Sequence, residues 1–231
     1  FAKEEAAALI QKSVRLAQEA RDLYLAERGA DGAVPLVAAS VGPYGAYLTD
    51  GSEYRGDYDV DEDALTAFHA GRLALLAEAK PDLLACETLP CLVEARAIVR
   101  ALRQEDIHIH AWFSFSCRDV AHISDGTEIT ACARFLNDVP EAAAIGLNCT
   151  APQYVEELIR AIRSETAKPI VVYPNSGEHY DTSDQSWHGA AEDFGRAAHR
   201  WRSAGARLIG GCCRTTPREI AEIAAWAKSA E

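Results

Sequence analysis

Two adjacent cysteines near the end of the chain, Cys212 and Cys213, stand between a pair of glycines and the start of a helix. Neighbouring side chains of a strand face opposite ways, so the pair can converge on one point only where the backbone leaves strand geometry. Gly210 and Gly211 would allow torsions that other residues avoid. A third cysteine, Cys149, ends an earlier apolar run. Three thiolates with a fourth position open are a ligand set of catalytic zinc.

Spacing alone also fits three buried thiols without a metal, which is the usual state of free cysteine. One adjacent pair and one distant cysteine form no recognised zinc pattern, and only their common position at strand ends favours a shared site. No histidine is expected to be a metal ligand. The other cysteines are expected to be core or surface thiols: Cys86, Cys91, Cys117 and Cys132.

The elements that position these residues follow an alternating pattern. Apolar spacing predicts a helix over residues 4–28, with Gly29 as its C-cap. Strands that alternate with helices indicate a parallel α/β sheet, either doubly wound or closed as a (β/α)₈ barrel. In both folds the chemistry gathers beyond the C-terminal ends of the strands. The predicted strands are residues 36–41, 83–87, 109–115, 144–148, 170–173 and 207–210.

Two helix starts are predicted next to the cysteines. Thr216 to Glu219 form a capping box, with threonine as N-cap and proline at the first helical position. Thr150 to Gln153 repeat that signal more weakly, directly after Cys149. Cys149 and Cys213 are therefore expected beside helix starts on the same rim of the sheet. Helix N-termini favour anions and lower the pKa of thiols.

Composition limits the class of protein. The 231 residues are 48% hydrophobic and carry a net charge of −12, which predicts one soluble domain over residues 1–231. An acidic chain without a basic stripe argues against nucleic acid and membrane partners, and it is compatible with a cationic small molecule. Seven cysteines without a secretory signal predict a reducing, cytoplasmic location. The oligomeric state is left open.

The chain resembles the zinc-dependent homocysteine S-methyltransferases, and most closely the branch that uses S-methylmethionine or S-adenosylmethionine. The family motifs are GLNC (146–149) and GGCC (210–213). The branch motifs are SVGPYGAYLTDGSEYRGDY (40–58) and YPNSGEHYD (173–181). The resemblance implies a (β/α)₈ barrel whose first βα units, including an Asp-Gly-Gly/Ala motif that helps bind homocysteine, are absent from this sequence.

The resemblance also implies the residues of the site and the reaction, a step of methionine biosynthesis. The methyl group of a sulfonium donor would pass to the thiolate of homocysteine, with no catalytic residue beyond the zinc ligands. Tyr44, Tyr47 or Trp112 could face the cationic donor or simply pack, and Tyr44 is included in the predicted substrate site. Implied by the family motifs are the zinc ligands Cys149, Cys212 and Cys213, Glu87 for the amino group of homocysteine, and the substrate-binding residues Asn148 and Asn175.

Two other functions compete with methyl transfer. The first is a zinc-binding or thiol-redox α/β protein, which would give no methionine from a sulfonium donor and homocysteine. The second is a barrel lyase or aldolase that acts through carboxylates, in which replacing Cys149 by alanine would leave activity intact.

Overall fold

The computed structural model describes residues 2–28, 33–181, 186–189 and 191–229. The long first helix, α1, spans Lys3–Arg28 and confirms the predicted helix, whereas Gly29 lies outside the described residues. No helix in the described part of the chain is long and apolar enough to cross a membrane. The other helices are α2 (Tyr44–Leu48), α3 (Glu62–Glu78), α4 (Leu92–Gln104), α5 (Ile129–Asn137), α6 (Val155–Glu165), α7 (Phe194–Ala204) and α8 (Pro217–Ser229), with 3₁₀ turns η1 (Ser52–Tyr54) and η2 (Pro152–Tyr154).

Six parallel strands form the sheet, in the order β1-β2-β3-β4-β5-β8, and all six predicted strands are confirmed. Their ends shift by up to two residues from the predicted ones. A separate antiparallel pair is made by β6 (His179–Asp181) and β7 (Ser186–His188). The sheet strands are β1 (Ala38–Val41), β2 (Leu83–Leu89), β3 (Ala111–Phe115), β4 (Ala142–Asn148), β5 (Ile170–Tyr173) and β8 (Ala206–Ile209).

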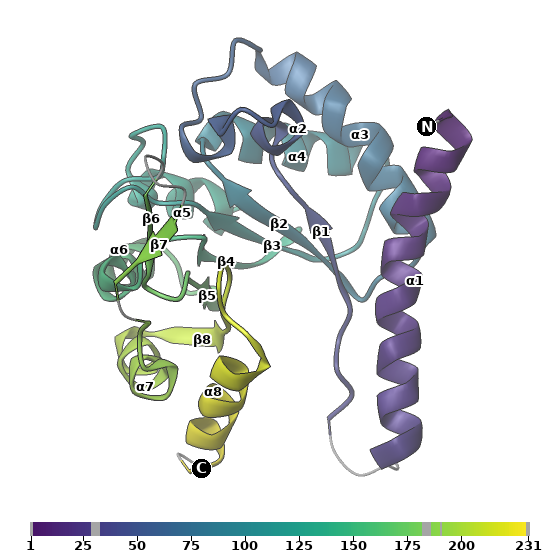
Figure 1. The fold of residues 1–231 in the computed structure, drawn as a ribbon. Helices are drawn as coiled ribbons and strands as arrows, with labels where there is room; N and C mark the ends of the chain where they lie inside the picture. Colours follow the sequence, from purple (N-terminus) through teal and green to yellow (C-terminus); the bar gives the residue numbers. More distant parts are fainter. Residues whose placement is uncertain (1, 29–32, 182–185, 190, 230–231) are drawn as a thin grey trace.

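The strand order separates the two predicted α/β folds. Each strand of the sheet pairs with the next one along the chain that belongs to it, without the reversal that a doubly wound sheet requires. Figure 1 shows the sheet curved, with α3, α4, α5, α6 and α7 on its outer side. This is the arrangement of a barrel wall, and the ends of all six strands therefore face one rim.

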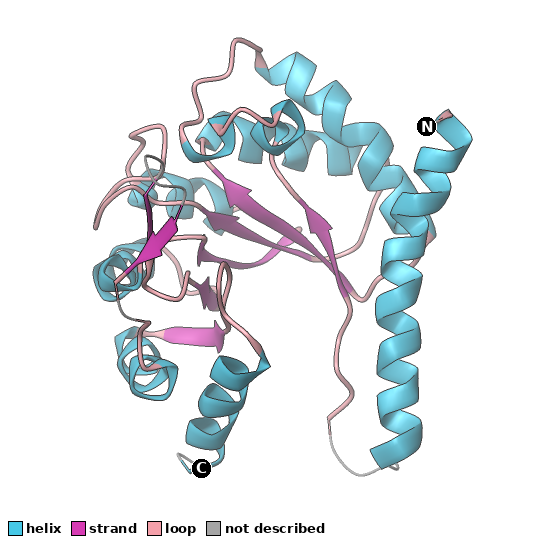
Figure 2. Cartoon of the chain, viewed as in Figure 1, coloured by secondary structure: helices cyan, strands magenta, loops and turns pink. Residues whose placement is uncertain are grey.

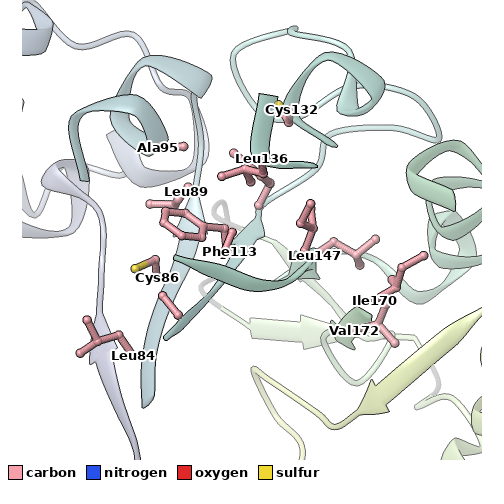
Figure 3. Packing of buried hydrophobic residues seen from close by; sticks show 14 of the residues in the cluster. Leu84, Cys86, Leu89, Ala95, Phe113, Cys132, Leu136, Leu147, Ile170 and Val172 are labelled. Carbon is pink, nitrogen blue, oxygen red and sulfur yellow. The ribbon is translucent and has the colours of Figure 1, made fainter. Parts of the chain in front are cut away.

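The core lies on both faces of the sheet, because parallel strands covered by helices are buried on both sides. Phe113 and Leu147 from adjacent strands are fully buried, and Figure 3 shows them among the side chains of neighbouring strands. Leu136 of α5 and Ala95 of α4 close this layer from the helix side. Packing of this kind holds the strands in register, so the residues that follow them are placed reproducibly at the rim.

The stronger helix start is confirmed and the weaker one is wrong. At α8, the Thr216 amide donates to Glu219 Oε2 (2.7 Å), as in a capping box, and Thr216 Oγ1 accepts from the Arg218 amide (3.2 Å), the N-cap bond to the second helical position. Thr150 caps no helix. Its Oγ1 accepts from the Cys117 amide (3.0 Å) and donates to the Asn148 carbonyl (2.9 Å), so α6 begins only at Val155, after η2.

Candidate active site

The structure brings the three strand-end cysteines together. Cys149 Sγ lies 2.7 Å from Cys212 Sγ and 3.7 Å from Cys213 Sγ, and all three sulfur atoms lie within 4.8 Å of one another. The three side chains are partly buried. They form the one group of three or more potential metal ligands found among the described residues. Three converging thiols are a donor set for a soft or borderline metal ion.

Hydrogen bonds to the segment after β5 hold the cysteine pair in place. The Cys212 amide donates to the Pro174 carbonyl (2.8 Å), and the Cys213 amide donates to Asn175 Oδ1 (3.2 Å). In return the Ser176 amide donates to the Cys213 carbonyl (3.0 Å). The turn that follows β8 is therefore fixed against the turn that follows β5, and both cysteines can face the same point.

The expectation that Gly210 and Gly211 supply unusual torsions is wrong, because neither has a positive φ. Gly211 is required for space, since a Cβ there would come within 2.5 Å of the Thr215 side chain. Two other residues here have left-handed backbone: Cys149 (φ 47°), a member of the cluster, and Arg214 (φ 62°), which directly follows Cys213. Left-handed backbone outside glycine is strained and is found where the surrounding structure imposes it, often at functional sites.

Thiol–thiol contacts dominate the electrostatics of the cluster. Hydrogen bonds from Cys149 and then Cys212 lower the pKa of Cys213 to about 3. The same contacts, followed by burial, raise the pKa of Cys149. Thiol–thiol contacts therefore favour a thiolate within the cluster, with Cys213 in hydrogen-bond contact with the Cys149 thiol (3.7 Å). A thiolate stabilised in this way is already in the form that binds a metal ion.

A cavity of about 570 Å³ opens beside the cluster. Cys149 and Cys213 line one part of it, and Tyr54 contributes an aromatic side chain that the sequence analysis missed. Burial, then the charges of Cys149 and Cys213, raise the pKa of Tyr54, which keeps its hydroxyl neutral. Its only signal in the sequence was its position within the motif at 40–58. The other lining residues are Ala151, Pro152, Gln153, Tyr154, Asn175, Gly177 and Glu178.

Glu87 lies where β2 becomes irregular. The pairing with β3 shifts between Cys86 and Leu89, and Thr88 has a φ of 60°. Such bulges re-aim side chains at the ends of strands. The carboxylate of Glu87 accepts from Ser40 Oγ (2.6 Å) and from the Tyr173 hydroxyl (2.9 Å). It is thus held by one residue of β1 and one of β5 while remaining partly exposed.

Asn148 connects this bulge to the cysteines. Its Oδ1 accepts from the Thr88 amide (2.7 Å), and its Nδ2 donates to Thr88 Oγ1 (2.7 Å) and reaches Cys212 Sγ at 4.0 Å. The side chain is 1% exposed. Asn148 therefore contributes to the site by holding Thr88, next to Glu87. Asn175 lines the cavity itself, with its Oδ1 bonded to the Cys213 amide.

The three aromatic residues that could face a cationic donor or simply pack do not line this cavity. The ring of Tyr44 packs edge-on against Tyr58 and Phe68, with centroids 5.4 and 5.0 Å away. Tyr47 is 68% exposed. Trp112 donates its indole N–H to the Tyr173 hydroxyl (2.9 Å). The cavity beside the cysteines is not lined by any of these three.

Comparison with known proteins gives one consistent result. The sequence matches the homocysteine S-methyltransferase family across residues 1–227. It is 54% identical over 229 residues to homocysteine S-methyltransferase YbgG of Bacillus subtilis, an alignment that covers 97% of this chain and 72% of that protein. It is 49% identical over 221 residues to the homocysteine S-methyltransferase of Escherichia coli, covering 94% and 71%.

A solved structure supports the same relationship. The metallated form of the homocysteine methyltransferase MmuM from Escherichia coli superimposes with a TM-score of 0.84 at 46% identity, covering 95% of this chain and 70% of that one. This similarity confirms the barrel-type fold expected from the strand order. The similar structure is a metallated form, which agrees with the cluster of three potential metal ligands in this chain. The chain belongs to the homocysteine S-methyltransferase family.

Proposed function

We propose that this methyltransferase holds a zinc ion on Cys149, Cys212 and Cys213 and transfers a methyl group from a sulfonium donor to homocysteine, giving methionine. The observation that carries the proposal is the convergence of three sulfur atoms within 4.8 Å beside a cavity large enough for a small substrate. No other residue is needed as a general acid or base.

The cysteine set fits zinc in number and chemistry, and one of its sulfur pairs also has the spacing of a zinc site. With a Zn–S bond of about 2.3 Å, two sulfurs of a tetrahedral site lie about 3.8 Å apart. Cys149 and Cys213 already have this separation, at 3.7 Å, whereas Cys149 and Cys212, at 2.7 Å, would have to move apart by about 1 Å. When bound, zinc would keep a coordinated thiol deprotonated near neutral pH and therefore nucleophilic.

Glu87 would bind the ammonium group of homocysteine. Its carboxylate receives one hydrogen bond from Ser40 and one from Tyr173, which orient it and leave lone pairs for a third donor. Asn148 keeps the bulge beside Glu87 in register with the cysteines through Thr88. Homocysteine would thus span from the carboxylate to the sulfur cluster, with its thiol at the cavity.

The donor side requires alignment rather than proton transfer. A new S–C bond forms from the homocysteine thiolate to the methyl carbon, and the old C–S bond of the sulfonium breaks. The leaving sulfur keeps that electron pair and departs as a neutral thioether, so no proton has to move. Positioning the two sulfurs in line supplies the catalysis. The negative charge of the thiolate cluster and the aromatic wall at Tyr54 suit a cationic donor.

The test supplies zinc-loaded protein with homocysteine and either S-methylmethionine or S-adenosylmethionine and measures methionine. We expect turnover with at least one of the two donors. Absence of turnover with both, in protein that contains one zinc per chain, would refute the sulfonium assignment. Replacement of Glu87 by glutamine should raise the KM for homocysteine by roughly 10- to 100-fold and leave the zinc content unchanged, because the negatively charged partner of the ammonium is lost.

A further inference from the structure

Three ionisable side chains are buried together between α3 and α4, and the reaction proposed above uses none of them. His69 and Glu94 are 0% exposed, and Arg72 is partly buried. His69 Nε2 lies 2.9 Å from Glu94 Oε1, and Arg72 Nη2 lies 2.8 Å from His69 Nδ1. These contacts make a continuous relay from a cation to an anion through one imidazole.

The order of donors in this relay is fixed by the guanidinium group. Arginine can only donate, so His69 Nδ1 must accept from Arg72. The proton of a neutral imidazole then resides on Nε2 and is donated to Glu94. Burial lowers the pKa of His69, which agrees with a neutral ring. The imidazole of His69 therefore bridges the Arg72 guanidinium and the Glu94 carboxyl group.

Both charged ends of the relay hold the backbone that leaves β1. Arg72 Nη2 donates to the Gly42 carbonyl (2.6 Å), and the Tyr44 amide donates to Glu94 Oε1 (2.5 Å). Hydrogen bonds to ionised groups are roughly twice as strong as neutral ones. The first turn after β1 is thus fastened at two points to the helix layer.

That turn is coupled to the cavity through α2. A Cβ at Gly45 would overlap the backbone of Ser52 and Glu53, so α2 and η1 meet backbone to backbone. The residue that ends η1 is Tyr54, which lines the cavity with Cys149 and Cys213. Figure 2 shows the whole connection as loop and short helix between the first strand and the long helix after it. Without the anchor, little regular structure would fix Tyr54.

We propose that the Arg72–His69–Glu94 relay is a positioning device that sets Tyr54 against the cysteine cavity, where the ring contacts the cationic methyl donor. The inference rests on the proposed function, because it assigns the donor to that cavity. Tyr54 is the residue that contacts substrate, and the three relay residues act through it. A cation over an aromatic ring changes binding by roughly 3- to 30-fold, which sets the size of the expected effect.

The first measurement is a kinetic comparison of His69→Leu and His69→Gln in the full-length protein. Leucine removes both hydrogen bonds, whereas glutamine keeps one acceptor for Arg72 and one donor for Glu94. We expect His69→Leu to raise the KM for the sulfonium donor by roughly tenfold, with the KM for homocysteine changed less than twofold. His69→Gln should recover most of the loss. Equal increases in both KM values would overturn the proposal.

The second measurement tests whether the relay acts through Tyr54. In a Tyr54→Ala background, His69→Leu should cause no further rise in the donor KM, because the effects of residues coupled through a shared backbone shift are not additive. A full tenfold rise in that background would contradict the inference. If His69→Leu does not fold, Glu94→Gln keeps the shape and the acceptor oxygen and is tested in the same two backgrounds.

A readout without catalysis separates this inference from the proposed function. Arg55 follows Tyr54 and its side chain is 52% exposed, so trypsin can report loosening of the segment. Cleavage after Arg55 should accelerate severalfold in His69→Leu. Thr66→Val is the matched control, because Thr66 is buried on the same helix but bonds only to the Glu62 carbonyl. Slow cleavage in His69→Leu would overturn the positioning role, whereas absence of turnover in the unmodified protein would refute only the donor chemistry.

Discussion

The seven cysteines fall into two groups that differ in burial and in the pKa of their thiols. Four are buried and lie among apolar residues, as Figure 3 shows for Cys86 and Cys132. Burial raises the pKa of Cys91 and Cys117 to about 12, so these thiols stay protonated. The strand-end cluster is partly buried, and thiol contacts lower the pKa of Cys213 to about 3. Surroundings, rather than residue type, decide which thiols can bind metal.

Cys117 and Cys149 belong to different groups although they follow adjacent strands of the sheet. Cys117 follows the end of β3, and Cys149 follows the end of β4. Thr150 connects the two segments, because its hydroxyl accepts from the Cys117 amide and donates to the Asn148 carbonyl. Cys117 turns inward, with its Sγ 3.8 Å from the Phe115 carbonyl. Cys149 has a left-handed backbone (φ 47°) and joins the cluster instead. The two thiols thus differ in backbone conformation as well as in burial.

The largest expected effect comes from replacing Cys149 by alanine, with the same replacement at Cys117 as the control. Cys149→Ala should abolish metal binding and lower kcat/KM by at least roughly 10³-fold, since thiol activation is lost. Cys117→Ala should retain one metal per chain and activity within about threefold. Metal analysis and methionine formation measure both. Substantial activity in Cys149→Ala would show that Cys149 is not needed for the reaction, and it would favour a lyase or aldolase that acts through carboxylates.

Thiol reactivity should separate the strand-end cluster from the four core cysteines. After chelation at pH 8, an alkylating reagent should modify Cys213 first, because thiol contacts lower its pKa, and then the other two cluster thiols, because they are only partly buried. A thiol with a pKa of about 12 is only about 10⁻⁴ thiolate at that pH, so the core set should react roughly 10³-fold more slowly than an ordinary thiol. Intact mass gives the count with time. A fourth rapid adduct would show that one core thiol is accessible.

Metal should stabilise the fold only through the cluster. At a free metal concentration of 1,000 times Kd, binding adds about 4 kcal/mol to the free energy of unfolding. Cys213→Ser should lose most of this increment, whereas Cys132→Ala should keep it. Denaturant titrations with and without zinc measure the increment. An unchanged increment in Cys213→Ser would place the stabilising metal elsewhere.

The smallest effects are expected in the core. Cys86 is 0% exposed, so Cys86→Ala should cost about 1 kcal/mol of unfolding free energy through the small cavity that it leaves. Cys86→Ser should cost about 1–3 kcal/mol, because a hydroxyl is buried in its place. Both variants should keep their metal content. Urea denaturation gives the two values, and a serine variant as stable as the parent would mean that Cys86 has a polar partner.

The sequence by itself determined the strands, because buried parallel strands are short apolar runs that need no knowledge of their partners. It also determined the cap of α8, since the Thr216–Glu219 bonds are local. The Thr150 signal failed because its hydroxyl found a long-range partner, the Cys117 amide.

Only the tertiary structure decided how the rim is arranged. The left-handed turn at Cys149, the bulge held by Asn148 at Thr88, and the approach of Tyr54 to the sulfurs each join segments far apart in the chain. The same holds for the steric role of Gly211, which depends on Thr215 rather than on its own torsion. Residue types fix what chemistry is available, whereas positions within a few ångströms depend on contacts that no local pattern encodes.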